Sequence, residues 1–171
     1  MFDEALYQIE MTRLLQDAEV VMRRDHPNVV IYSVAIWTDP NAAVSAVSVD
    51  TKENSDVRLA RLTAWAHARQ ADALAAGDLE LAVRLGNLPP RNCNPAEFVI
   101  RELASAKHRS FPRGWEDASG GDCWQELGRA LRAVRAKAME MFRSFPLHPD
   151  AELATNGASD WYDSPSPLHS R

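Results

Sequence analysis

The side chains best suited to catalysis or metal binding are two cysteines and five histidines, and their spacing predicts neither activity. Cys93 lies in a stretch rich in proline and asparagine, and Cys123 begins an expected helix, whose dipole lowers the pKa of a thiol. No two histidines are four residues apart and none belongs to an H-E-x-x-H pattern, so we expect no metal site. Neither a G-x-S-x-G elbow nor a phosphate-binding P-loop is present. We therefore expect no enzyme and no cofactor, with an unrecognised site around Cys93, His67 or His108 as an alternative.

A second group of candidates is acidic and aromatic, which suits binding to another protein. Four acidic residues lie in and just after an expected hairpin, where only Lys52 and Arg58 offset their charge, and such a patch steers a basic partner. Near the C-terminus an aromatic pair stands between two aspartates, a composition that suits an interface anchor. The candidate partner-binding residues are Trp37, Asp39, Asp50, Glu53, Asp56, Asp160, Trp161, Tyr162 and Asp163. Ordinary solvated surface, or an aromatic strap packed on its own domain, is the alternative interpretation.

A basic run follows one side of the last expected helix and comprises Arg129, Arg132, Arg135 and Lys137. Residues three apart lie on neighbouring turns, so the run forms a stripe. A solvated helix face is the simplest interpretation. Pairing with nearby glutamates, or with an acidic partner, is the alternative.

Composition and charge are those of an ordinary folded protein, with 46% hydrophobic and 25% charged residues. At 171 residues the length favours one domain with a core of its own. The formal net charge of −5 argues against a nucleic-acid partner, which would require a basic surface. No apolar run approaches the roughly 20 residues of a membrane span, and residues 1–4 lack the basic start of a signal peptide. We therefore expect a cytoplasmic protein without a membrane partner.

The first third of the chain predicts an amphipathic helix followed by a hairpin. Over about residues 3–24, apolar side chains recur every three or four residues, which indicates a helix with one buried side. Residues 29–38 are dense in β-branched and aromatic types, and residues 43–50 interleave serine with apolar side chains. Because only a short turn containing Asp39-Pro40-Asn41 separates them, these strands should form an antiparallel hairpin over 29–50.

The rest of the chain has mostly helical patterns, over about 55–76, 79–85, 96–108 and 123–145. After Pro146 the composition shifts to Asp, Ser, Pro and Asn, which predicts an acidic Ser/Pro-rich C-terminal tail over 147–171. The expected fold class is α+β, in a single domain over 1–146. It comprises a small, mainly antiparallel sheet that includes the 29–50 hairpin, packed by amphipathic helices at both ends of the chain.

The hairpin also carries a family resemblance. The segment I-Y-S-V-A-I-W-T-D over 31–39, followed by V-S-V-D-T-K-E-N over 47–54, resembles an uncharacterised bacterial domain family with a Y-x-x-A-L-Y-T-D strand and an N-T-E-E-like helix start. P-A-E-F over 95–98 is similar to a later P-x-E-W element of that family, with phenylalanine in place of tryptophan. These motifs are structural and carry no catalytic residues.

Members of such families recur among immunity proteins of bacterial polymorphic-toxin and contact-dependent competition systems. The resemblance therefore implies a protein that neutralises a cognate toxin by direct contact. Many such toxins are basic nucleases, which an acidic inhibitor attracts over long range. An adaptor or chaperone for a secreted effector is the main alternative function. A homodimer, in which the arginine stripe meets the acidic patch, is an alternative use of the same charges.

Overall fold

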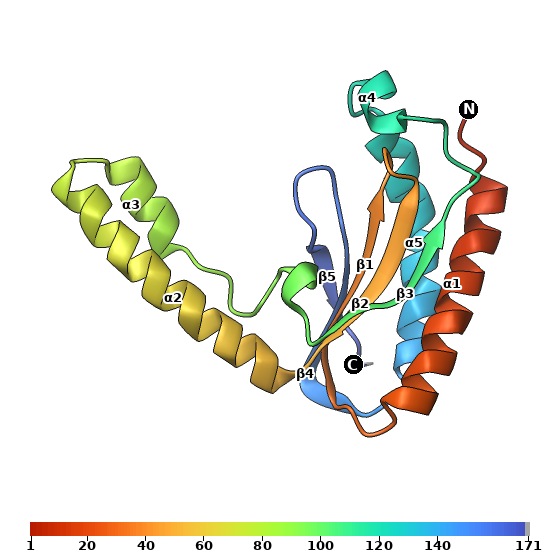
Figure 1. The fold of residues 1–171 in the computed structure, drawn as a ribbon, viewed down its shortest axis with the longest axis horizontal. Helices are drawn as coiled ribbons and strands as arrows, with labels where there is room; N and C mark the ends of the chain where they lie inside the picture. Colours follow the sequence, from red (N-terminus) through yellow and green to blue (C-terminus); the bar gives the residue numbers. More distant parts are fainter. Residues whose placement is uncertain (170–171) are drawn as a thin grey trace.

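A five-stranded sheet forms the centre of the protein, with two long helices against one face and a helical hairpin that extends away from it (Figure 1). This computed structural model describes residues 1–169. The fold is α+β, as the sequence predicts. Its elements are α1 (Glu4–Asp25), β1 (Ile31–Asp39), β2 (Val44–Asp50), α2 (Lys52–Ala75), α3 (Leu79–Gly86), the short 3₁₀ helix η1 (Pro95–Glu97), β3 (Ile100–Lys107), α4 (Trp115–Ser119), α5 (Cys123–Phe142), β4 (Leu147–Thr155) and β5 (Asp163–Pro167).

The strands lie in the order β3-β2-β1-β4-β5, so β1 is the central strand. β1 and β2 form the predicted antiparallel hairpin, in which Ile36 is the partner of Val47. β3 pairs with β2 in the antiparallel sense, and β4 lies parallel to β1 on its other side. The sheet is mixed because a long crossover, which includes α2 to α5, separates β1 from β4 in the chain.

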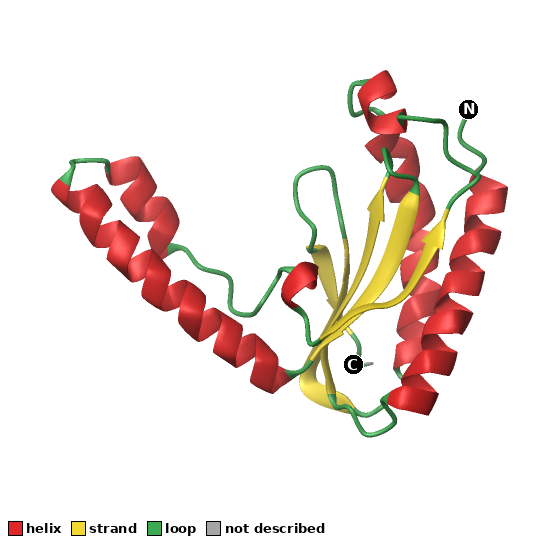
Figure 2. Cartoon of the chain, in the orientation of Figure 1, coloured by secondary structure: helices red, strands yellow, loops and turns green. Residues whose placement is uncertain are grey.

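α1 and α5 lie together along one face of the sheet (Figure 2). Alternation along β1 points Val34 and Ile36 toward these helices and leaves Ala35 and Trp37 on the opposite face. The apolar stripes of both helices are buried in this core, as their spacing predicts. Their most buried large side chains are Tyr7, Met11, Leu14, Met22, Leu127 and Phe142.

The segment predicted as a helix over 96–108 is a strand instead. β3 occupies Ile100–Lys107 and supplies the partner that β2 needs on its outer edge. The helical prediction was wrong because apolar residues here are spaced three and four apart around a bulge, at which Glu102 adopts a φ of 48°. Pairing with β2 therefore outweighs the local helical preference of the alanines.

The C-terminal segment belongs to the sheet and is not a tail. β4 and β5 both lie within 147–169, and β4 pairs with β1 inside the sheet. Several of the sparse apolar residues of this segment are buried, with Leu153 and Leu168 in the main core. The predicted domain boundary at residue 146 was therefore wrong, because few but regularly placed apolar residues are enough for an inner strand. Residues 170–171 lie outside the described part of the chain.

The helical hairpin of α2 and α3, here called the arm (residues 52–86), projects away from the sheet (Figure 1). Both helices were predicted from the sequence. Their contact is shallow: the apolar side chains buried in the two helices are the alanines Ala66, Ala73 and Ala82, and Gln70 Nε2 donates to the Ala82 carbonyl at 2.8 Å. None of the helices within residues 1–169 has the length and apolar character needed to span a membrane.

Candidate functional site

The face of the sheet opposite α1 and α5 is only partly covered. Its floor is made of small residues, because β1 and β4 point Ala35 and Ala154 to this side. Phe98 and Tyr162 pack over these two alanines with their rings 6.1 Å apart. Further along β1, Trp37 stands beyond this cover and is half-buried.

Trp37 meets Trp161, which lies on the connection between β4 and β5. The two ring centroids are 5.8 Å apart and the rings are nearly perpendicular, at 85°. This edge-to-face arrangement is favourable for aromatic pairs. Trp161 nevertheless stays 53% exposed, so most of its area is available to another molecule. Two segments from opposite ends of the sequence thus form one aromatic corner.

Interactions on either side of Trp161 hold its loop in place. Asp160 accepts a hydrogen bond from the Tyr162 backbone N–H at 3.0 Å, and the Asp160 carbonyl accepts one from Gly157 at 2.9 Å. The hydroxyl of Tyr162 donates to Glu152 at 2.9 Å, and Glu152 also forms an ion pair with Arg91 at 3.0 Å. Burial raises the pKa of Tyr162 above its usual value, so its hydroxyl remains a donor. The aromatic corner is therefore anchored on a preformed polar cluster.

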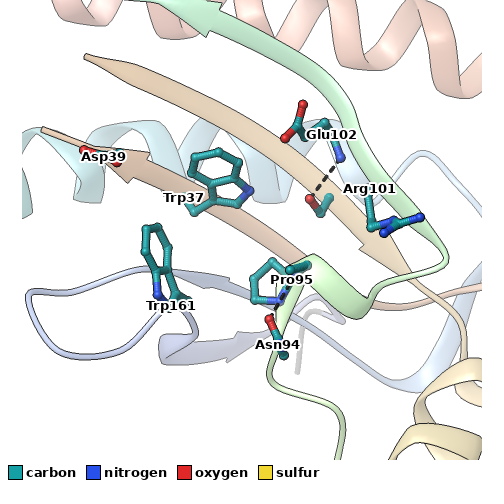
Figure 3. Close-up of a pocket in the computed structure, with 9 residues that line it drawn as sticks. Trp37, Asp39, Asn94, Pro95, Arg101, Glu102 and Trp161 are labelled. Atoms are coloured by element: carbon teal, nitrogen blue, oxygen red, sulfur yellow. Dashed lines mark hydrogen bonds between the residues drawn. The ribbon is translucent and has the colours of Figure 1, made fainter. Parts of the chain in front are cut away.

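A pocket of about 450 Å³ opens beside the corner (Figure 3). Trp37 and Trp161 form one wall, and Pro95 belongs to the wall contributed by η1. Glu102 also lines it, because the bulge in β3 turns this residue out of the regular strand alternation. The backbone N–H of Glu102 donates to Ser48 Oγ at 3.2 Å, which secures the bulge. Arg101 is the basic residue of this lining and lies on the side away from Trp161.

A smaller cavity of about 230 Å³ adjoins the first and shares Asp39 and Trp161 with it. Glu116, on α4, enters this lining and accepts a hydrogen bond from the indole N–H of Trp124 at 2.6 Å. Asp39 accepts two backbone N–H bonds of the β1–β2 turn, which fixes its carboxylate at the rim. The two cavities together define an acidic aromatic patch, comprising Trp37, Asp39, Glu102, Glu116, Asp160 and Trp161.

Sequence reasoning named four of these six residues but missed Glu102 and Glu116. Glu102 lies in the segment expected to be helical, so its position beside Trp37 depends on β3 pairing. Glu116 lies in a polar stretch, and α4 is brought to the patch by Asn41, whose side chain bonds to the α4 backbone and to Asp117. Neither residue had a local sequence signal.

Asp50 is not a surface residue, which corrects its assignment to partner binding. It is completely buried and accepts hydrogen bonds from the side chains of Asn54 and Asn92 and from the Val99 N–H, at 2.7, 3.2 and 3.1 Å. Burial raises the pKa of Asp50, and the bonds from Val99 and the asparagines partly oppose this rise. Asp50 therefore ties the start of the arm and the 92–99 segment to the sheet.

The other predicted residues do not form one surface with the patch. Glu53 and Asp56 are exposed at the base of the arm, near the end of β1 away from Asp39, and Asp56 pairs with Lys52 at 2.6 Å. Tyr162 is buried, as described above, and Asp163 is exposed where β5 begins. The structure thus brings together Trp37, Asp39, Asp160 and Trp161 and separates them from Glu53 and Asp56.

His108 is part of a buried chain of hydrogen bonds. Its Nδ1 lies 2.9 Å from Glu10 Oε2 and its Nε2 lies 2.7 Å from Ser45 Oγ, an acid–imidazole–hydroxyl order that nucleophilic enzymes also use. Ser45 is completely buried beneath α1 and bonds onward to Thr38 at 2.6 Å. A nucleophile must reach its substrate, and this hydroxyl is closed off from solvent. The chain of bonds therefore serves the core, where it satisfies polar groups.

The remaining candidates for chemistry are not activated. Burial raises the pKa of the Cys93 thiol to about 11, and the nearby carboxylates of Glu152 and Asp160 add to this rise. Cys123 is buried in the core, where burial likewise raises the pKa of its thiol. His67 is exposed on α2. Within residues 1–169, no three His, Cys, Asp or Glu side chains gather in a way that could hold a metal ion.

No protein-family model, curated protein or solved structure matches the chain. Any inference about the function therefore depends on the geometry of the acidic aromatic patch. Its chemistry is that of recognition: two indoles offer flat apolar area, and the carboxylates around them offer negative charge.

Proposed function

We propose that the protein is a bacterial immunity protein that binds a basic cognate toxin through the acidic aromatic patch and so neutralises it. The observation that carries this proposal is the Trp37–Trp161 corner, preformed and half open to solvent, with Asp39, Glu102 and Asp160 around it. Such a corner suits a lysine or arginine side chain of the toxin, because an indole face attracts a cation and a nearby carboxylate adds to the attraction.

The energetics of the patch favour protein binding. An exposed tryptophan already held in place loses little conformational freedom when a partner covers it, so its apolar area contributes to affinity. Truncating such an anchor typically costs about 2 kcal/mol, or roughly 30-fold in affinity. The net charge of −5 adds long-range attraction for a basic toxin and speeds association. We place this encounter in the cytoplasm and link it to interbacterial competition.

The experiment begins with tagged protein in its native bacterium, from which a bound polypeptide is captured, identified and purified. The decisive measurement is the activity of that polypeptide with and without this protein, together with the affinity of variants. We expect Trp161→Ala to weaken binding about 30-fold. We expect Glu102→Gln/Asp160→Asn to slow association and to reduce its salt dependence. The matched control is Glu53→Gln/Asp56→Asn, which removes two charges at the base of the arm and should leave both quantities unchanged.

Two results would contradict the proposal. A captured polypeptide that remains active in the complex would indicate an adaptor or chaperone for a secreted effector. Equal affinity of wild type and Trp161→Ala would show that the toxin binds elsewhere. The enzyme alternative requires loss of function when Cys93, His67 or His108 is replaced by alanine without loss of folding.

A further inference from the structure

The arm presents large apolar side chains to solvent, an arrangement opposite to that of an ordinary helical hairpin. The apolar residues buried in its helices are alanines, so the contact between α2 and α3 removes little apolar surface from water. Six of its large apolar side chains are exposed: Val57, Leu62, Trp65, Leu74, Leu79 and Val83. Trp65 is the largest of these and is 56% exposed.

Trp65 lies within a basic stripe on one side of α2. Arg58, Arg61, Trp65 and Arg69 follow one another at spacings of three and four residues, which places them on one side of the helix. This side is about 100° around the helix from Ala66, which is completely buried. Within the described residues, none of the three arginines forms an ion pair. We call these four residues the Trp65 stripe.

The net charge of the arm differs from that of the rest of the chain, and this difference indicates which surface the Trp65 stripe can bind. The arm contains five basic and five acidic residues, so the whole net charge of −5 belongs to the remainder of the chain. The acidic residues of the patch outnumber its one basic neighbour, Arg101. Two stripes would repel each other through their arginines, whereas a stripe and a patch attract.

We propose that the Trp65 stripe docks on the acidic aromatic patch of a second copy of this chain. In this contact Trp65 lies against the Trp37–Trp161 corner, while Arg61 and Arg69 face the carboxylates of the patch. Charged rims around a central aromatic contact are the usual composition of a specific interface. The arrangement is reciprocal, since each copy offers one stripe and one patch.

The geometry of the chain favours a contact between two copies over a contact of the arm with the patch of its own copy. The arm begins next to Asp50, whose partner in β1 is Ser33, whereas the patch lies around Asp39 at the other end of that strand. Six residue steps along β1 separate Ser33 from Asp39 by roughly 20 Å. The arm also diverges from the sheet (Figure 1). A twofold, antiparallel pair of copies places each arm beside the other's patch, with two equal contacts.

This dimer goes beyond the proposed function and does not depend on any toxin. Because both uses require the same patch, a basic toxin and the second copy would compete for it. The dimer would then be a resting form that protects its aromatic corner from non-specific contacts. Its existence is tested on the purified chain alone, so failure of the dimer leaves the toxin-binding proposal standing.

The test is the mass of the protein in solution, measured by sedimentation or light scattering over a range of concentrations. We expect a concentration-dependent dimer at about 0.1 M salt that weakens at about 1 M, where the Debye length falls from roughly 10 Å to roughly 3 Å. Arg61→Glu/Arg69→Glu and Glu102→Lys/Asp160→Lys should each be monomeric. The matched control is Arg129→Glu/Arg132→Glu, two exposed arginines on α5, which should still dimerise.

The sharpest measurement mixes the two charge-reversed variants. In that mixture the acidic arm of one chain meets the basic patch of the other, and both contacts of the pair are again complementary. We expect a one-to-one heterodimer from two monomeric variants, each with an unchanged circular dichroism spectrum. A wild-type monomer at all concentrations would overturn the proposal, as would a dimer that survives both reversals or a mixture that stays monomeric.

Discussion

Replacing Asp50 by alanine should destabilise the protein, although Asp50 is not itself part of the acidic aromatic patch. The carboxylate accepts hydrogen bonds from Asn54 and Asn92 and from the backbone N–H of Val99. Asp50→Ala leaves these three donors without their acceptor. The change therefore weakens the join between the sheet, the start of the arm and the 92–99 segment.

The magnitude follows from how well water can replace the lost bonds. Asn92 is buried, so its orphaned amide costs about 1–3 kcal/mol. Asn54 is half-buried and Val99 is exposed, so each of their bonds contributes less, about 1 kcal/mol. Burial raises the pKa of Asp50, which means that its charge costs stability as the pH rises through that value, and its removal offsets part of the loss. The net expectation is about 2–3 kcal/mol.

The assay is urea unfolding followed by tryptophan fluorescence and circular dichroism. In thermal melts of a chain of this length, a loss of this size lowers the melting temperature by roughly 4–12 °C. Glu53→Ala is the matched control, because Glu53 is an exposed acid three residues later, and it should change stability by less than about 0.5 kcal/mol. Equal stabilities of the two variants would refute the structural role of Asp50. Asp50 would then again be a candidate residue for partner binding.

Three further outcomes can be measured on the isolated protein. Burial lowers the pKa of His108 below 6.5, so stability should be full above about pH 6.5 and fall as the pH drops through the lowered value; His108→Gln should flatten this part of the curve. In a Cys123→Ser background, Cys93 should react with a disulfide reagent at pH 8 on the order of 100-fold more slowly than free cysteine, and a rate near that of free cysteine would contradict its burial. A chain that stops after Pro146 should lack cooperative unfolding in thermal melts, because it has lost β4 and β5; a sharp transition would restore the tail interpretation.

Those parts of the fold that depend on local patterns could be predicted from the sequence. The hairpin follows from two β-rich runs around a short turn, and α1 and α5 follow from apolar side chains at helical spacing. β3 could not be found this way, because its bulge at Glu102 breaks strand alternation and leaves helix-like spacing. β4 was hidden by Pro149 and Asp150, which lie on its exposed positions. Both strands are recognised only through their partners in the sheet.

In the candidate site, too, residue types could be predicted from local sequence, but contacts between distant segments could not. Trp37 and Trp161 were each named from composition, but their meeting requires β4 to pair with β1 and so could not be read from either segment. Asp50 was grouped with the surface acids because charge in a sequence does not reveal burial; only the donors around it do. The exposed arm also lay outside prediction, since helical spacing indicates which residues share a side but not whether anything covers that side.

The position of β4 between β1 and β5 has a consequence for the newborn chain. During synthesis β1 leaves the ribosome long before β4, so the edge of β1 that β4 later occupies stays unpaired while more than a hundred residues are added. The hairpin, α1 and the arm can form in this interval, but Trp37 has no Trp161 beside it until the last strands arrive. The aromatic corner is thus completed only when translation of the domain is nearly finished. A pause or truncation late in synthesis would leave an exposed strand edge, which exposes the unfinished chain to aggregation.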